Sequence, residues 1–93
     1  MAAASGWDAD RSWQLHPSVG MRPEAFGALV YHYGSRRLTF LKDLLLTDVV
    51  RSLGEHPDGG SALDAAGVPQ ERRPAIQAAL DRLVHAEVIR VRD

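Results

Sequence analysis

The four histidines of this 93-residue sequence are the side chains best suited to metal binding or acid–base catalysis. They lie at positions 16, 32, 56 and 85, and no two are three or four residues apart, the spacing that places two ligands on one helix face. The sequence has no cysteine, so it offers no thiolate ligand, no cysteine nucleophile and no disulfide. The serine-nucleophile motif G-x-S-x-G and the phosphate-binding motif G-x-x-x-x-G-K-[ST] are also absent. We therefore expect no catalytic site, no metal site and no bound cofactor, and predict that the chain is not an enzyme.

Length and charge narrow the classes of protein further. The chain is long enough for one domain, and its 11 Lys and Arg against 12 Asp and Glu give a net charge of −1. A nucleic-acid binder is usually basic, so near neutrality disfavours that class. We find neither an apolar run of about 18 residues nor a basic-then-apolar start, and expect a cytoplasmic protein without a membrane partner. We predict a flexible tail over residues 1–12 and a single domain over residues 13–93.

The charge is distributed unevenly along the chain. Residues 13–42 contain four Arg or Lys against one Glu, whereas residues 43–69 contain five Asp or Glu against one Arg. The basic first half is suited to an acidic partner.

Residues 19–41 carry the pattern of a three-stranded antiparallel sheet. A short extended piece over residues 19–21 precedes a β-like run over residues 26–33, and Gly34-Ser35 favours a two-residue type II′ turn, because glycine accepts a positive φ. With that turn, alternate residues of the hairpin share a face. The better core face contains Leu29, Tyr31, Leu38 and Phe40, and the opposite face contains Val30, His32, Arg37 and Thr39.

The second half of the sequence has helical periodicity. Asp43 is a candidate N-cap for a helix that ends at Gly54, with an apolar stripe at Leu46, Val49, Val50 and Leu53. Ser61-Ala-Leu-Asp64 predicts the start of a short helix that ends at Gly67. A third helix lies within residues 70–86, with Pro74 in its first turn. Its apolar face is formed by Ile76, Leu80, Leu83 and Val84.

These elements predict an α+β, winged helix-turn-helix-like fold, in which an N-terminal three-stranded antiparallel sheet is followed by three helices. One function that fits this fold is that of a winged-helix DNA-binding transcriptional regulator. The exposed start of the third helix would then read bases through Glu71, Arg72, Arg73 and Gln77. The acidic middle of the chain and the lack of a basic stripe for phosphates count against it.

The sheet predicts a different function. In a three-stranded meander the strand over residues 36–41 is an edge, whose outward N–H and C=O groups have no partner. Such an edge accepts an extended peptide as an extra strand. The third helix would form the other side of the groove. Acidic residues of the peptide would meet the arginines Arg36, Arg37, Arg72 and Arg73.

Several segments are specific enough to point to a family. The two most distinctive are R-P-E-x-F-G-A-L, over residues 22–29, and R-R-L-x-F-L-K, over residues 36–42. Together with residues 15–19, 31–34, 63–68 and 72–74, they resemble the mycofactocin biosynthesis peptide chaperones. This family belongs with the precursor-peptide recognition domains and is related to the pyrroloquinoline quinone peptide chaperone. The resemblance covers roughly residues 13 to 91.

The resemblance implies a peptide chaperone without catalytic activity or cofactor. Such a protein binds the mycofactocin precursor peptide and delivers it to a radical S-adenosylmethionine (SAM) maturase, which holds the iron–sulfur clusters. In related recognition domains the leader of the peptide adds as a strand to the third strand, against the third helix. The peptide-binding residues expected here are Arg36, Arg37, Leu38, Thr39, Phe40, Leu41, Arg72, Arg73, Ile76, Gln77 and Leu80. On this interpretation neither a nucleic acid nor a membrane is a partner.

Overall fold

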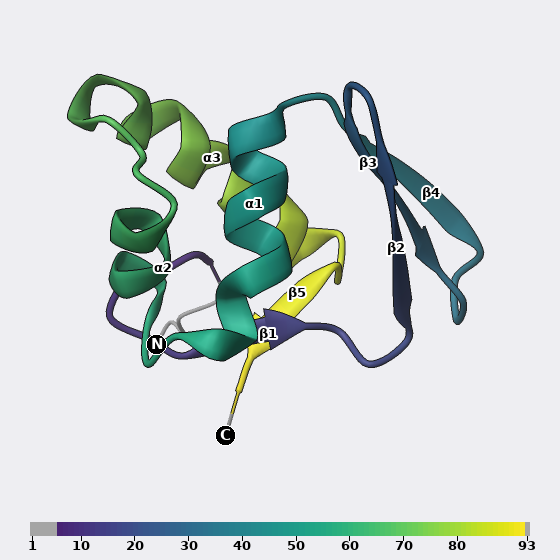
Figure 1. The fold of residues 1–93 in the computed structure, drawn as a ribbon. Coiled ribbons are helices and arrows are strands. Elements are labelled where there is room, and N and C mark those ends of the chain that lie inside the picture. The colour runs from purple at the N-terminus through teal and green to yellow at the C-terminus, as the bar shows by residue number, and fades with distance from the viewer. Residues whose placement is uncertain (1–5, 93) are drawn as a thin grey trace.

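The computed structural model describes residues 6–92, which form an α+β fold. The strands are β1 (Trp13–Leu15), β2 (Val19–Glu24), β3 (Gly27–His32), β4 (Arg37–Leu41) and β5 (Ile89–Val91). The α-helices are α1 (Leu44–Ser52), α2 (Gly59–Ala65) and α3 (Arg73–His85), with 3₁₀ turns η1 (Leu53–Glu55) and η2 (Gln70–Arg72). Figure 1 shows α1 and α3 in the middle of the molecule, between the sheet of β2, β3 and β4 and the short helix α2.

The strands of residues 6–92 make two antiparallel sheets, not one. One sheet has the order β2-β3-β4, and in the other β1 pairs with β5. The amide of His16 donates to the carbonyl of Val88, and Pro17 follows, so the chain turns away from β1 before β2 begins. The predicted α+β class is confirmed and the single sheet is wrong. The winged helix stays a prediction.

The predicted pairing of β3 with β4 is confirmed, including Leu29 opposite Phe40. The predicted two-residue turn is wrong, because the loop spans residues 33–36 and its positive φ of 61° lies at Arg36 instead of Gly34. The loop adds one residue on each side of the predicted pair. The pairing of the strands is therefore unchanged.

The core face of this hairpin is the opposite of the predicted one. Ala28 and Val30 of β3 are 0% and 1% exposed, whereas Leu38 and Phe40 of β4 are each 54% exposed. Helix α1 packs against β3, and a Cβ at Gly27 would collide with the backbone of β4. The same face also buries Leu41 and His32, which are 2% and 7% exposed. The face that packs against α1 is therefore the buried one, although the opposite face carries the larger apolar side chains.

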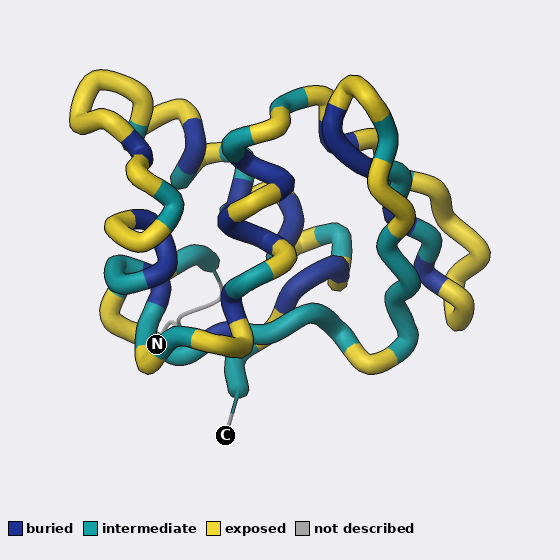
Figure 2. Tube along the Cα trace, viewed as in Figure 1, coloured by how far each residue is buried: buried dark blue, intermediate teal, exposed yellow. Residues whose placement is uncertain are grey.

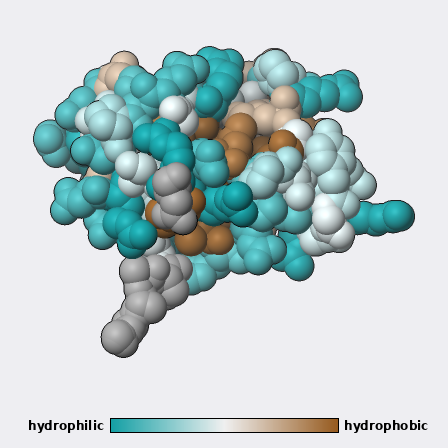
Figure 3. Space-filling model, turned by 90° about the horizontal axis from the view of Figure 1, so that it is seen from below, coloured by the Kyte–Doolittle hydropathy of each residue, from teal (hydrophilic) through white to brown (hydrophobic). Residues whose placement is uncertain are grey.

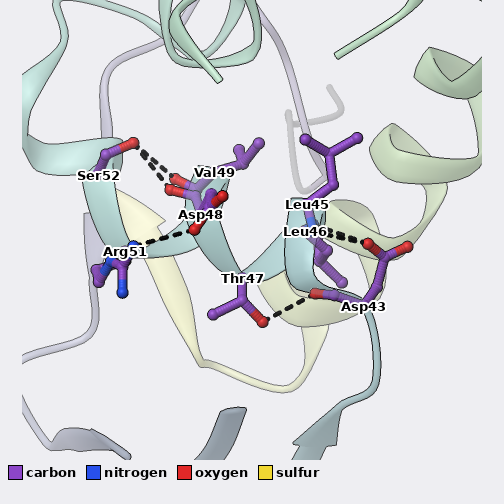
Figure 4. Close-up of polar contacts among 8 residues, drawn as sticks. All are labelled: Asp43, Leu45, Leu46, Thr47, Asp48, Val49, Arg51 and Ser52. Atoms are coloured by element: carbon purple, nitrogen blue, oxygen red, sulfur yellow. Dashed lines mark hydrogen bonds and ion pairs between the residues drawn. The ribbon is translucent and has the colours of Figure 1, made fainter. Parts of the chain in front are cut away.

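Helix α1 begins where the sequence predicts. One carboxylate oxygen of Asp43 accepts hydrogen bonds from the amides of Leu45 and Leu46, at 2.9 and 3.1 Å, as Figure 4 shows. The carbonyl of Asp43 accepts a third bond, from the Thr47 hydroxyl. The predicted apolar stripe is buried at each of its positions, Leu46, Val49, Val50 and Leu53.

The other two helices differ in how well their starts were predicted. Helix α2 begins before Ser61, because its N-cap is Asp58, whose carboxylate accepts a hydrogen bond from the Ser61 amide at 2.8 Å. The first turn of α2 therefore includes Gly59 and Gly60. Pro74 lies in the first turn of α3, as predicted. It fits there because the first amides of a helix have no partner within the helix.

The core lies where α1, α3, β3 and β5 meet, as the buried positions in Figure 2 show. Trp13 is 2% exposed, and Trp7 stacks on it with ring centroids 5.1 Å apart.

Residues 1–5 of the expected flexible tail lie outside the described residues. Trp7, which also belongs to the expected tail, packs on the domain and donates its indole N–H to Gln77. On the face seen in Figure 3, apolar patches lie near the middle and hydrophilic side chains surround them.

Candidate functional site

A groove of about 510 Å³ runs between β4 and α3. Strand β4 contributes the consecutive residues Thr39, Phe40 and Leu41. Side chains of consecutive strand residues point to opposite faces of a sheet, so the groove follows the edge of β4 rather than one of its faces. The remaining lining residues are Lys42, Asp43, Leu46, Arg72, Ala75, Ile76, Ala79, Arg82, Leu83 and Ala86.

The hydrogen-bonding pattern of the sheet shows which backbone groups face this groove. The amide of Tyr33 donates to the carbonyl of Ser18, so the odd-numbered residues of β3 bond to β2 and the even-numbered ones to β4. Thr39, which pairs with Val30, therefore bonds inward. The N–H and C=O groups of Leu38 and Phe40 point out of the sheet.

The other edge of the same sheet, that of β2, carries a proline. The pairing that directs odd residues of β3 toward β2 leaves the backbone of Pro23 facing outward. Proline has no N–H to donate, and its ring obstructs an approaching strand. Of the two edges of the β2-β3-β4 sheet, that of β4 carries no proline and is the better suited to an added strand.

The side of the groove opposite β4 is formed by α3 and carries small residues. Ala75 and Ala79 are four residues apart, so they lie on the same face of α3 and leave space above the groove floor. Ile76 and Leu83, 2% and 5% exposed, form that floor. The wall and floor are apolar, which suits an apolar side chain of a bound chain.

The groove carries more positive than negative charge. Lys42, Arg72 and Arg82 line it, against the single carboxylate of Asp43. Arg72 donates to Asp43 and so joins η2 to the start of α1. Arg82 makes no ion pair within the part of the chain that the structure describes. The groove thus has charges available for an acidic ligand.

The carboxyl group of Asp43 is adapted to stay ionised. Burial, the largest single influence, raises its pKa, but the Leu46 amide, the Arg72 guanidinium and the Leu45 amide together outweigh burial. The net result is a pKa below the ordinary value of 3.8. A lowered pKa in the folded state means that the charge stabilises the fold above the unfolded pKa, and that this stabilisation is lost as pH falls through the folded pKa.

Replacing Asp43 by alanine is expected to lower the free energy of unfolding by about 1 kcal/mol at pH 7, since it removes the cap of α1. Asp43→Asn keeps a capping oxygen and loses only the charge, so it is expected to cost less. Urea unfolding at pH 7 and near pH 3 measures both. The gap between wild type and Asp43→Asn should narrow in acid, and an alanine variant as stable as the asparagine variant at pH 7 would contradict the capping role.

Five of the predicted peptide-binding residues line the groove. These are Thr39, Phe40, Leu41, Arg72 and Ile76. Leu38 contributes its outward backbone groups just before them. Arg36 and Arg37 are exposed beyond that end of the groove and do not line it. Their roles stay predictions.

Three of the predicted residues are engaged within the chain instead. Arg73 donates to Asp64 at 2.6 Å, Gln77 accepts from the indole of Trp7 at 2.8 Å, and Leu80 is 0% exposed. Arg73 and Gln77 also belong to the set expected to read DNA bases, of which the other two members, Glu71 and Arg72, are exposed.

Sequence reasoning missed most of the helix side of the groove. Ala75, Ala79, Arg82 and Ala86 follow one another at spacings of four, three and four residues, which is one face of a helix. That face adjoins the predicted apolar stripe and was readable as a second stripe. Its small residues carry little hydrophobic signal, and so they attracted no functional interpretation.

No metal centre is formed by the described part of the chain, where no three His, Cys, Asp or Glu side chains gather. Among the described helices, none combines the length and apolar character needed to cross a membrane.

The profile of the peptide chaperone MftB family matches residues 12–90. The chain belongs to the peptide chaperone MftB family. A peptide chaperone MftB of Mycolicibacterium smegmatis is 48% identical over 83 residues, which cover 89% of this chain and 81% of the relative. That of Mycobacterium ulcerans is 53% identical over 78 residues, 83% of this chain and 72% of the relative. No solved structure matches the chain.

Membership of the MftB family decides between the predicted classes of function. The relatives are named as peptide chaperones, a role without catalysis, and the prediction that this chain is not an enzyme is confirmed on that ground. A third MftB, from Mycobacterium tuberculosis, is 52% identical over 67 residues, 72% of this chain and 62% of the relative. The family name also supports a peptide as the partner.

Proposed function

We propose that this chain binds the mycofactocin precursor peptide by adding the leader of that peptide as a fourth strand to the β2-β3-β4 sheet. The observation that carries the proposal is the free edge of β4, whose outward groups at Leu38 and Phe40 border a groove closed by α3. Backbone hydrogen bonds to this edge would give affinity, and the groove would select side chains. Strand β4 is five residues long, about 17 Å, so the paired part of the leader is of similar length.

The proposed role continues with delivery of the peptide to the radical SAM maturase. The chain holds the leader by its backbone and leaves the rest of the precursor unbound. Contact of the same chain with the maturase then raises the local concentration of peptide at the enzyme. Titration calorimetry with a synthetic precursor peptide tests the first step, and absence of binding with and without the maturase would refute the proposal.

Charge reversal at Arg82 tests the electrostatic part of the proposal. Arg82 lines the groove, and Arg82→Glu is expected to weaken binding of the precursor peptide about fivefold at low salt, where screening is weakest. The matched control is Arg90→Glu on β5, an exposed arginine outside the groove, which should bind like wild type. Calorimetry at two salt concentrations measures both variants. Equal affinities for the two at low salt would remove Arg82 from the site.

A further inference from the structure

The face of the β2-β3-β4 sheet that points away from α1 is apolar. We call it the outer face; it is made of alternate residues of the hairpin, Leu29, Tyr31, Leu38 and Phe40, with Tyr33 at one end. The solvent side of an antiparallel sheet is ordinarily polar. Here Leu38 and Phe40 are each 54% exposed and Tyr33 is 61% exposed. The reversal of the predicted core face has thus left the more hydrophobic side in solvent.

The outer face has a shaped hollow at its centre. A cavity of about 330 Å³ is lined by Leu29, Tyr31 and Leu38 of the hairpin and by Gly20 and Arg22 of β2, among others. Gly20 lies opposite Tyr31 in the sheet. A Cβ at Gly20 would collide with the hydroxyl group of Tyr33, so a larger residue there would displace the exposed ring of Tyr33.

The rim of the outer face is basic. Arg22, whose side chain is 76% exposed, lies on β2, and Lys42 lies over the ring of Phe40 at 5.9 Å from its centroid. Arg36 is exposed in the loop at the end of the hairpin. The carboxylate of Glu24 is paired with Arg22 at 3.0 Å. An apolar surface bordered by cations is complementary to an apolar surface bordered by carboxylates.

Charge and size both disfavour a second copy of this chain as the occupant. Two outer faces brought together would place basic rims against each other, and like charges across an interface are costly. Three strands about 4.8 Å apart and about 20 Å long have a flat footprint of roughly 300 Å². This is small for a standard stable interface, which buries roughly 800 Å² of accessible surface per partner. A contact of this size fits a transient encounter with a different protein.

We propose that the outer face docks the radical SAM maturase, through an apolar patch on that enzyme bordered by carboxylates. This inference rests on the proposed function, because it names the surface for the second partner. Phe40 belongs to both surfaces: its backbone faces the groove and its side chain the outer face. A peptide strand added at β4 would therefore lie beside the docked enzyme, without competing for the same face.

Two variants of the outer face test the docking. Tyr31→Glu places a carboxylate in the middle of the apolar surface, and Arg22→Glu reverses a rim charge on a side chain that is 76% exposed. Binding of each variant to the purified maturase is measured by biolayer interferometry, and binding to the synthetic precursor peptide by calorimetry. We expect Tyr31→Glu to weaken maturase binding at least about tenfold and Arg22→Glu at least about threefold, with peptide affinity within twofold of wild type.

Arg90→Glu is the matched control for charge and should bind the maturase like wild type. Maturase binding by both outer-face variants at wild-type strength would overturn the proposal. A concentration-dependent dimer in sedimentation that Tyr31→Glu abolishes would overturn it as well, since the occupant would be a second copy. Failure of the wild-type chain to bind the peptide would count against the proposed function instead. The measurements of maturase binding would still decide whether the outer face docks the enzyme.

Discussion

Replacing Phe40 by proline is expected to weaken binding of the precursor peptide at least about thirtyfold while the sheet stays folded. The N–H of Phe40 points out of the sheet, so proline removes a bond to the peptide and none of the bonds between β3 and β4. A peptide carbonyl left without a partner costs about 1–3 kcal/mol, to which the lost hydrogen bond and the obstructing ring add. Calorimetry gives the affinity, and circular dichroism confirms the fold.

Two controls separate the backbone from the side chain and from the fold. Phe40→Ala loses the ring but keeps the N–H, and it is expected to bind within about threefold of wild type. Thr39→Pro removes an inward N–H that pairs with Val30, and it should destabilise the sheet itself. A folded Phe40→Pro variant that binds the peptide as tightly as Phe40→Ala would refute strand addition at β4.

Truncation of Leu80 is expected to produce the largest change in stability, a loss of about 3 kcal/mol. Leu80 lies on the buried face of α3 and is 0% exposed, so Leu80→Ala removes buried apolar surface and leaves a cavity. Leu44→Ala is the matched control, because Leu44 is 60% exposed and its loss should cost less than about 0.5 kcal/mol. Urea unfolding of the two variants measures the difference.

The same variant decides whether Leu80 belongs to the site or to the core. At a temperature where Leu80→Ala is still folded, its affinity for the precursor peptide should stay within about twofold of wild type. A stability change below about 1 kcal/mol, or a large loss of peptide affinity with the fold intact, would show that Leu80 acts in peptide binding, as the sequence predicts, and not mainly in the core.

Local chemistry made part of the fold predictable. Asp43 was recognisable as a cap because a short side chain with a carboxylate precedes an apolar stripe. Pro74 marked the start of α3, because an α-helix readily accepts proline only in its first turn. The strand register followed from the position of the hairpin loop, although the turn type differed. The pairing of β1 with β5 joins the two ends of the chain and has no local signal.

The buried face of the hairpin was not predictable from hydrophobicity, because it depends on which side of the sheet α1 packs against, a contact that has no local signal in the sequence. Ala28, Val30 and Leu41 are buried on that side, and Leu38 and Phe40, on the other side, are each 54% exposed. The candidate site divides in the same way. An unpaired edge over residues 36–41 follows from strand order, whereas the alanines of α3 that shape the groove carry weak signals in sequence.

Amide hydrogen exchange of the ¹⁵N-labelled chain, with and without the synthetic precursor peptide, tests the central claim most directly. Strand addition at β4 predicts an alternating response. The outward amides of Leu38 and Phe40 should exchange at least about tenfold more slowly with the peptide, while the inward amide of Thr39, already bonded to β3, changes little. Unchanged exchange at Leu38 and Phe40 under saturating peptide, or protection confined to the outer edge of β2, would contradict the account.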